Sequence, residues 1–273
     1  YSDVGNYTFD TYLDYVQQGI YLWENSPYVK NYPELYFLNY VLFHRTNDEE
    51  IKPCRTYFWK KIKDKVQGKA MVEAALEINH WCAGEVMYQG TDMRTGSALE
   101  IYRSGVGRCG EEAVFVVNVM RSAGIPARPV YVPRWSHCDD NHAWVEVWCD
   151  GDWHYLGACE PEAVLDKGWF TNAASRAMMI GSRWYDRAMP DEKVIGKDGM
   201  NRIINLLGKY AKTRWITITV EDLDGTPAAG AKVRAEVMNY GEFSPIAIME
   251  ADKNGCISFE TGFGSLLICA VYD

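Results

Sequence analysis

Residues 105–148 constrain this chain more than any other part of its sequence. The stretch opens with GVGRCGEEA and continues with apolar residues at helical spacing. Gly124 follows, and glycine is favoured just past the end of a helix. The stretch closes with HAWVEVW, which starts at His142 and alternates as a strand does. The pattern therefore predicts a helix that begins close to Cys109 and a strand that begins at His142.

Cys109 and His142 are the residues of this stretch best suited to covalent chemistry. A thiol in the first turn of a helix lies at the positive end of the helix dipole, so we expect a lowered thiol pKa. A cysteine nucleophile also needs a base, which a histidine on a neighbouring strand can supply. The alternative is an inert buried cysteine and a structural histidine. The glycines that flank Cys109 favour the catalytic interpretation.

Three sequence blocks in this order resemble the transglutaminase-like superfamily, a papain-related group that includes the peptide N-glycanases. The blocks are GxGxCGExA around Cys109, RSAGIPAR ending at Arg128, and HAWVEVW from His142. The resemblance implies an α+β fold with a papain-like, transglutaminase-like core, in which the cysteine helix packs on an antiparallel sheet. It also implies that Cys109 is the nucleophile, that His142 is the base and that an acid lies on the next strand.

The third catalytic position departs from the family pattern. Aligned from Trp153, the usual aspartate falls on Gly157, and the nearest acid is Glu160. We predict Glu160 as the third catalytic residue. Asp139, Asp140 or a backbone carbonyl are alternatives for orienting the imidazole.

The hairpin between the two strands bears on this choice. A two-residue loop, Asp150-Gly151, makes His142 face Cys159 and turns Glu160 to the other side of the sheet. A three-residue loop that includes Asp152 makes His142 face Glu160. The family role favours the three-residue loop.

Further side chains are candidates for contact with substrate. Tyr102 precedes the cysteine helix. The polar loop before His142 contains two more candidates, Trp135 and His137, at positions where a substrate could pass. We predict substrate-binding roles for Tyr102, Trp135, His137 and Trp144. Gln89, Tyr102 and Arg103, with the Cys109 backbone amide, are candidates for stabilising an oxyanion, and Arg176 is either a groove residue or a surface charge.

Composition narrows the classes of partner. The 273 residues carry a net charge of −9 and a pI near 5.2, which argues against nucleic acid or an anionic membrane as the main partner. No apolar run has the length of a membrane span. The eight cysteines are too scattered for a disulfide scaffold. Cys138, His142, Cys149 and Cys159 match no common zinc spacing, and we predict no metal and no cofactor.

The chain divides into three predicted domains. Residues 1–75 form a helical N-terminal subdomain, with helices at 8–23, 35–44 and 55–66, and a further helix at 69–81 leads into the catalytic core of residues 76–213. Residues 161–214 read as turns and helix. Residues 214–273 contain short alternating strands and predict a small β-sandwich. That stretch resembles carboxypeptidase-regulatory-like or Ig-like modules of secreted bacterial proteins, which favours an exported, periplasmic or extracellular, protein.

These observations predict cysteine-dependent acyl transfer on a protein or peptide substrate, with cell-wall peptides and glycoproteins among the candidates. Hydrolysis, as in a protease or amidase, is favoured because no calcium-loop pattern is visible. Transglutaminase and peptide N-glycanase activities are the enzymatic alternatives. A binding or scaffolding module that has lost its chemistry is the alternative from another class, and Gly157 at the usual acid position supports it.

Overall fold

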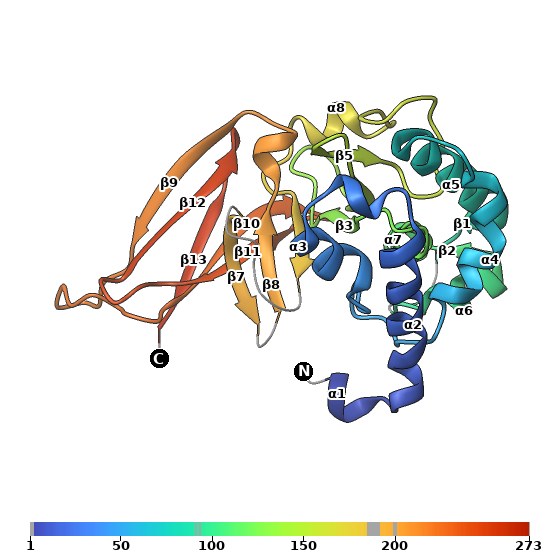
Figure 1. Cartoon of the computed structure of the whole chain (residues 1–273). Coiled ribbons are helices and arrows are strands. Elements are labelled where there is room, and N and C mark those ends of the chain that lie inside the picture. Colours follow the sequence, from blue (N-terminus) through green and yellow to red (C-terminus); the bar gives the residue numbers. More distant parts are fainter. Residues whose placement is uncertain (1–2, 91, 93, 185–191, 199–200, 273) are drawn as a thin grey trace. The chain divides into compact units, whose positions relative to one another are not determined.

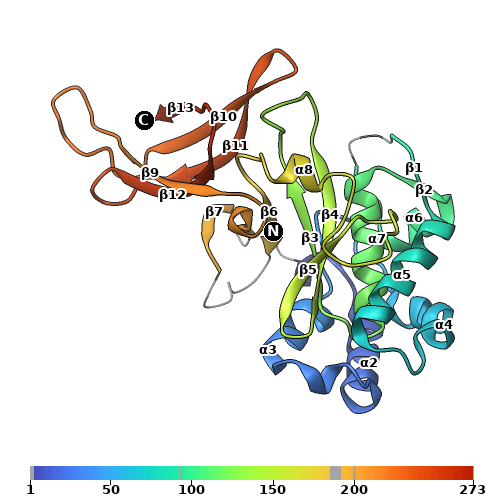
Figure 2. The same cartoon turned by 90° about the horizontal axis from the view of Figure 1, so that it is seen from above.

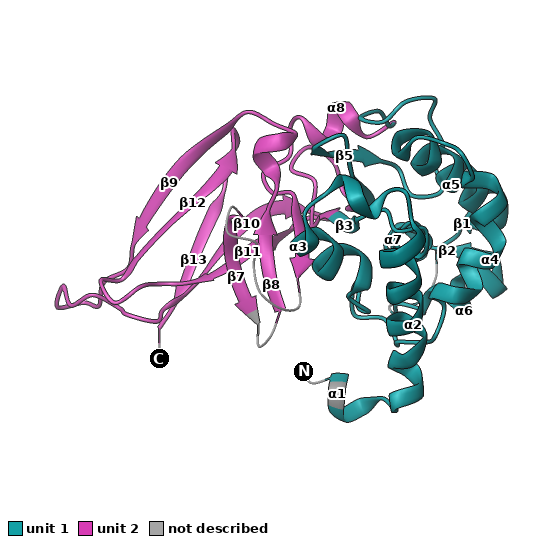
Figure 3. Cartoon of the chain, in the orientation of Figure 1, with its two compact units in different colours: residues 1–130, 143–168 teal, residues 131–142, 169–273 magenta. Residues whose placement is uncertain are grey.

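The computed structural model describes residues 3–90, 92, 94–184, 192–198 and 201–272. The chain forms two compact units (Figure 3), each with its own hydrophobic core. Unit 1 consists of residues 1–130 and 143–168, and unit 2 of residues 131–142 and 169–273. These units cut across the three predicted domains, whose boundaries stay predictions. The fold is α+β, as predicted.

Helices dominate the first part of unit 1 (Figure 1), where the sequence periodicity predicted them. A π-helical turn continues α3, and together they occupy the stretch predicted as one short helix. Helix α6 is capped by a reciprocal pair, Ser97 and Glu100, and ends at Gly105, whose φ of 70° is the left-handed conformation favoured at helix ends. The helices are α1 (Asp3–Asn6), α2 (Phe9–Asn25), η1 (Val29–Asn31), α3 (Glu34–Phe37), η2 (Leu38–Leu42), α4 (Arg55–Val66), α5 (Met71–Glu85), α6 (Ala98–Ser104) and α7 (Cys109–Ser122).

Strands β3 (Ala127–Val132), β4 (His142–Cys149) and β5 (Asp152–Leu156) are neighbours in the order β5-β4-β3. The β4–β5 hairpin turns at Asp150 and Gly151, whose φ values of 52° and 92° are typical of a two-residue turn. Cys149 pairs with Asp152 and Val145 with Leu156. The three-residue loop that the family role favoured is therefore wrong, because an Asp-Gly pair readily adopts the positive φ angles of the shorter turn.

Helix α7 is the centre of the unit 1 core. Every residue from Glu111 to Ser122 is buried. Its apolar side chains share one cluster with those of α4 and α5 and with Val145 and Val147 of β4. The predicted packing of the cysteine helix against an antiparallel sheet is confirmed. A short parallel pair, β1 (Met87–Tyr88) with β2 (Val106–Gly107), leads into the helix.

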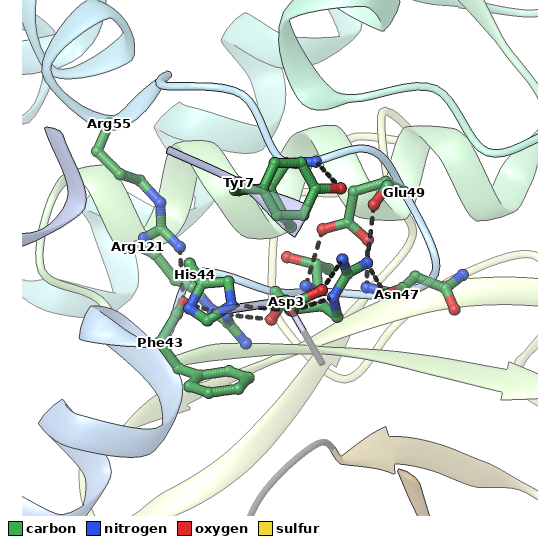
Figure 4. A network of polar contacts seen from close by, with 11 residues as sticks. Asp3, Tyr7, Phe43, His44, Asn47, Glu49, Arg55 and Arg121 are labelled. Atoms are coloured by element: carbon green, nitrogen blue, oxygen red, sulfur yellow. Dashed lines mark hydrogen bonds and ion pairs between the residues drawn. The ribbon is translucent and has the colours of Figure 1, made fainter. Parts of the chain in front are cut away.

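A buried polar network fixes the far end of α7 (Figure 4). The Arg121 guanidinium donates to the carbonyls of Phe43 and Arg45, each at 3.0 Å. Arg45 in turn donates to the Glu49 carbonyl at 2.7 Å and to the Asp3 carboxylate at 2.7 Å. These bonds tie α1 and the segment after η2 to the last turn of α7.

Unit 2 is mainly β-structure. Strands β6 (Gly181–Trp184), β8 (Asn201–Asn205) and β7 (Val194–Asp198) are neighbours in that order, and Tyr131 pairs with Gly181. The expectation of only turns and helix at 161–214 is thus wrong: the helix α8 (Thr171–Ala174) and the 3-10 turn η3 (Leu207–Lys209) are present, but so are three strands. These strands are short and have polar residues at their ends, so their sequences show no clear alternation of apolar and polar residues. They form by pairing with each other.

The C-terminal strands form two further antiparallel sheets, coloured orange to red in Figure 2. One has the order β11-β10-β13, with β10 (Lys232–Asn239), β11 (Glu242–Glu250) and β13 (Leu267–Val271). The other pairs β9 (Thr213–Thr219) with β12 (Cys256–Gly262). Side chains of both sheets share one buried cluster that includes Val233, Met249 and Phe259. The predicted C-terminal strands are confirmed, and their likeness to an Ig-like module stays a prediction.

Candidate functional site

Cys109 is the first residue of α7, as predicted. The Glu111 carboxylate accepts hydrogen bonds from the backbone N–H groups of Arg108 at 3.1 Å and Gly96 at 3.0 Å, which fixes the start of the helix. The Arg108 side chain donates to the Arg94 carbonyl and to the Thr95 hydroxyl, each at 3.0 Å. The loop before the helix is therefore tied to the turn that carries the thiol.

The Cys109 thiol is partly buried and accepts hydrogen bonds from the backbone N–H groups of Gly110 and Ala143. Burial raises its pKa above the ordinary value, and the nearby carboxyl of Glu112 acts in the same direction. The two N–H groups and Arg108 oppose this effect without reversing it. The expectation of a lowered pKa is therefore wrong: the loss of solvation at this helix start outweighs the favourable dipoles.

His142 is the last residue of unit 2 before the chain re-enters unit 1 at Ala143. Its side chain is buried, and its ring lies 4.7 Å from that of Trp169 and 5.0 Å from that of Phe170. Burial lowers the His142 pKa to about 4, although the Asp140 charge acts to raise it. The imidazole is therefore neutral at pH 7. The contact between Cys109 and Ala143 brings the thiol to the residue that follows His142 in the chain.

Glu160 folds back over Gly157 in the turn that follows β5. A Cβ atom added to Gly157 would overlap the Glu160 carboxylate and lie 3.2 Å from its Cδ. The turn is closed by a hydrogen bond from the Glu160 N–H to the Gly157 carbonyl at 3.2 Å, and Cys159 takes a φ of 57°. The Glu160 carboxylate thus occupies the space that a side chain at position 157 would fill. The catalytic role of Glu160 stays a prediction.

Asn79 of α5 holds this turn in place. Its side-chain amide donates to the Gly157 carbonyl at 2.9 Å and accepts from the Cys159 N–H at 3.1 Å. Asn79 is buried. An isolated asparagine in a helix gives no signal in the sequence that it supports a distant turn.

Glu112, one turn into α7, is a second acid that sequence reasoning missed. It is 3% exposed, and its pKa is raised to about 8 by burial and by the charges of Glu160 and Glu111. A carboxyl in such surroundings is protonated at neutral pH. The available signal was a pair of adjacent acids at the start of an otherwise apolar helix.

The predicted substrate-binding residues lie in different surroundings. Trp144 and Trp135 are buried, with exposures of 0% and 2%, and so offer almost no surface to a ligand in this conformation. Tyr102 packs between Trp81 and Phe115 at the edge of the unit 1 core. His137 is exposed and lines a groove in unit 2. Binding roles for these four residues stay predictions.

The other candidates have identifiable partners. Asp139 accepts a hydrogen bond from the Tyr240 N–H at 2.5 Å, and Asp140 accepts one from the Asn141 N–H at 2.8 Å. The Gln89 N–H donates to the Gly107 carbonyl at 2.9 Å. Within the described ranges, no group of three or more His, Cys, Asp or Glu residues could hold a metal ion.

Two motif residues have a structural role that sequence reasoning did not assign. Arg128 and Glu146 form an ion pair at 2.7 Å between β3 and β4, with side-chain exposures of 3% and 2%. The Arg128 guanidinium also lies 4.1 Å from the Trp153 ring centroid. The RSAGIPAR and HAWVEVW blocks are therefore joined in the core by opposite charges.

The model of the transglutaminase-like superfamily matches residues 60–158, a range that contains Cys109 and His142 and ends before Glu160. No match was found among curated proteins. In the described part of the chain, no helix combines the length and the apolar character that a membrane crossing requires.

Several solved structures are similar to parts of this chain. A candidate protease from Parabacteroides distasonis is 18% identical, with 47% of this chain and 25% of that chain covered and a TM-score of 0.36. A candidate cysteine protease from Cytophaga hutchinsonii is 18% identical. The alignment covers 55% of this chain and 57% of that chain, with a TM-score of 0.33. A red sea bream transglutaminase is 10% identical. The alignment covers 94% of this chain and 53% of that chain, with a TM-score of 0.35. The alignments span less than two thirds of each of these proteins. Residues 60–158 are therefore similar to the transglutaminase-like superfamily.

Proposed function

We propose that this protein catalyses cysteine-dependent acyl transfer from peptide or amide substrates to water, and so acts as a hydrolase of the protease or amidase type. The observation that carries the proposal is the position of the Cys109 thiol at the start of α7. There it accepts a hydrogen bond from the backbone N–H of Ala143, the residue after His142. This arrangement brings the residues of the cysteine block and the histidine block together. A protein or peptide is the proposed substrate.

In this proposal the resting site holds a neutral thiol and a neutral imidazole, in keeping with the raised pKa of Cys109 and the lowered pKa of His142. The Cys109 sulfur attacks the amide carbonyl while His142 takes the thiol proton. A C–S bond forms, the C–N bond breaks, and the proton leaves with the amine. Water then attacks the thioester while His142 takes one of its protons. The C–S bond breaks, the carboxylic acid leaves, and His142 returns the proton to the Cys109 sulfur.

The backbone N–H of Cys109, at the start of α7, is the proposed oxyanion donor, because the first N–H groups of a helix lack a partner in the preceding turn. Glu160 is the proposed acid that orients the imidazole. Its carboxylate occupies the space of a side chain at position 157, where the family pattern has an aspartate.

The test is the formation of a thioester on Cys109. The protein is mixed with an activated acyl donor, such as a nitrophenyl ester of a short blocked peptide, quenched in acid and mapped by peptide mass spectrometry. We expect acylation of Cys109 in wild type, none in Cys109→Ser, and a rate about 10²–10⁴-fold lower in His142→Ala and Glu160→Gln. Cys138→Ser removes an exposed thiol and is the matched control.

Addition of a primary amine separates hydrolysis from cross-linking. We expect the acyl-enzyme to decay mainly to the free acid when the amine is present. Accumulation of the amide would instead assign transglutaminase chemistry.

The burial and raised pKa of Cys109 also favour a second candidate, a binding module without catalysis. Acylation of Cys109 no faster than that of Cys138 would contradict the enzymatic proposal and support this one.

A further inference from the structure

Unit 2 contains a groove of about 1060 Å³. Its walls come from the loop before His142, the segment after α8, the segment after η3, and one end of the β11-β10-β13 sheet. All of its lining residues belong to unit 2. The groove shares no residue with the predicted catalytic set of Cys109, His142 and Glu160.

The groove exposes large apolar side chains. Phe263 is 67% exposed, Met238 53%, Phe243 51% and Leu267 41%. Single exposed apolar residues are ordinary on a protein surface, but several lining one hollow indicate a binding surface. None of these four side chains brings a hydroxyl or amide group to the groove.

Basic groups line the same groove. Arg176 and Lys212 are exposed lining residues, and within the described ranges neither forms an ion pair. The acid of the lining, Glu236, is buried and paired with Arg234 at 3.0 Å. Because the whole chain carries a charge of −9, this local excess of positive charge stands out from the rest of the molecule. Charge complementarity therefore selects an acidic ligand.

The groove wall formed by Ser136 and His137 is joined to the segment that contains Arg176. The Ser136 hydroxyl donates to the Arg176 carbonyl at 3.3 Å. Burial, together with the Arg176 charge, lowers the His137 pKa and so favours the neutral imidazole, which can both donate and accept a hydrogen bond.

The ladder between β10 and β13 stops before the end of β10. Strand β10 runs to Asn239, but its ladder with β13 ends where Glu236 pairs with Leu267. In the described part of the chain, residues 237–239 therefore have a ladder partner only on the β11 side. Val237 and Met238 line the groove. Val237 is 3% and Asn239 1% exposed, so β10 meets the groove mainly through the exposed Met238 side chain.

We propose that this groove binds an extended acidic peptide. Its apolar side chains lie on Met238, Phe243 and Phe263, and its carboxylates face Arg176 and Lys212. A peptide fits better than a sugar because a peptide can carry both the apolar and the acidic side chains that match this lining. This site is independent of the acyl-transfer chemistry proposed for Cys109.

The test is fluorescence anisotropy with a labelled peptide in which Glu alternates with Leu and Phe. Two peptides of the same length serve as probes of charge, one with Gln and one with Lys in place of Glu. We expect saturable binding of the Glu peptide that weakens with added salt, weaker binding of the Gln peptide and none of the Lys peptide.

Variants locate the site. Arg176→Glu, Lys212→Glu and Phe263→Ala should each weaken binding of the Glu peptide by about tenfold or more. Lys253→Glu and Leu223→Ala, which change exposed residues outside the groove lining, should leave it unchanged. The same affinities are expected with Cys109→Ala protein, so a failure of the proposed chemistry and a failure of this site are distinguishable.

Equal binding of the Glu and Lys peptides, or affinities that ignore the groove variants, would overturn the proposal. Binding of anionic lipid vesicles through Arg176 and Lys212, with no binding of the Glu peptide, would also overturn it.

Discussion

At the scale of single residues, the acids around the predicted site differ in what burial does to them. Glu111 uses its carboxylate to cap α7, whereas Glu112 lies in the core beside the charge of Glu160. The Glu112 pKa, about 8 in the folded chain, stands well above the ordinary value of 4.5. Folding therefore takes up a proton between these two pH values. The stability that this proton contributes is complete below pH 4.5 and is lost as the pH rises through 8.

Glu112→Gln keeps the shape of the side chain and removes its charge. We expect the free energy of unfolding of the variant, relative to wild type, to increase by roughly 1–3 kcal/mol from pH 5 to pH 8, since one proton is worth at most about 1.4 kcal/mol per pH unit. Urea unfolding at the two pH values measures this. Glu24→Gln on the exposed face of α2 is the control, with no such trend. Parallel pH profiles for Glu112→Gln and wild type would show that Glu112 is ionised in the folded chain.

At the scale of elements, β3 and β4 are joined by the buried Arg128–Glu146 pair. Removal of one partner of a buried pair leaves the other charge without compensation, which costs far more than the loss of a surface ion pair.

Glu146→Gln should lower the free energy of unfolding by about 3–5 kcal/mol. The matched control is Glu77→Gln, which removes one partner of the half-exposed Lys69–Glu77 pair at 3.8 Å and should cost less than about 1 kcal/mol. Urea denaturation of wild type, Glu146→Gln and Glu77→Gln measures these differences in the free energy of unfolding. Similar losses in both variants would mean that the buried pair contributes no more than a surface pair.

The sequence predicts the elements of this fold where local pattern alone determines them. Helices α4 and α7 and strands β4 and β9 follow from apolar spacing, and the position of Cys109 at a helix start follows from its glycines. Strands β6 to β8 escape such reasoning because they are short, lack a clear alternation and form by pairing with each other.

The site is less predictable than the helices that carry it. The pKa values of Cys109 and His142 depend on burial, which no local pattern reports. Similarly, the way Glu160 folds over Gly157 depends on a turn that the distant Asn79 supports.

At the scale of the whole molecule, the eight cysteines all lie among the described residues, and each is a free thiol. Cys54, Cys82 and Cys149 are buried. This arrangement agrees with the expectation of no disulfide scaffold, which stays a prediction. The two units are therefore stabilised by their cores, without covalent cross-links between side chains.

A reducing agent should consequently leave the stability unchanged, because no disulfide restricts the unfolded chain. We expect the midpoint of urea unfolding to be the same with and without dithiothreitol, and about eight thiols to react with Ellman's reagent in denaturant without prior reduction. A lower midpoint in dithiothreitol would reveal a disulfide that contributes to stability.

The burial of α7 along twelve consecutive residues also limits how this protein can evolve. Almost any substitution between Glu111 and Ser122 changes the volume or charge of the core, so selection removes most variants there before their activity matters. New specificities have to arise in surface segments, such as the exposed residues 136–141, where sequence can drift at little cost in stability. Cys109 is thus inherited with its helix as one block, while the exposed segments around it remain free to diverge.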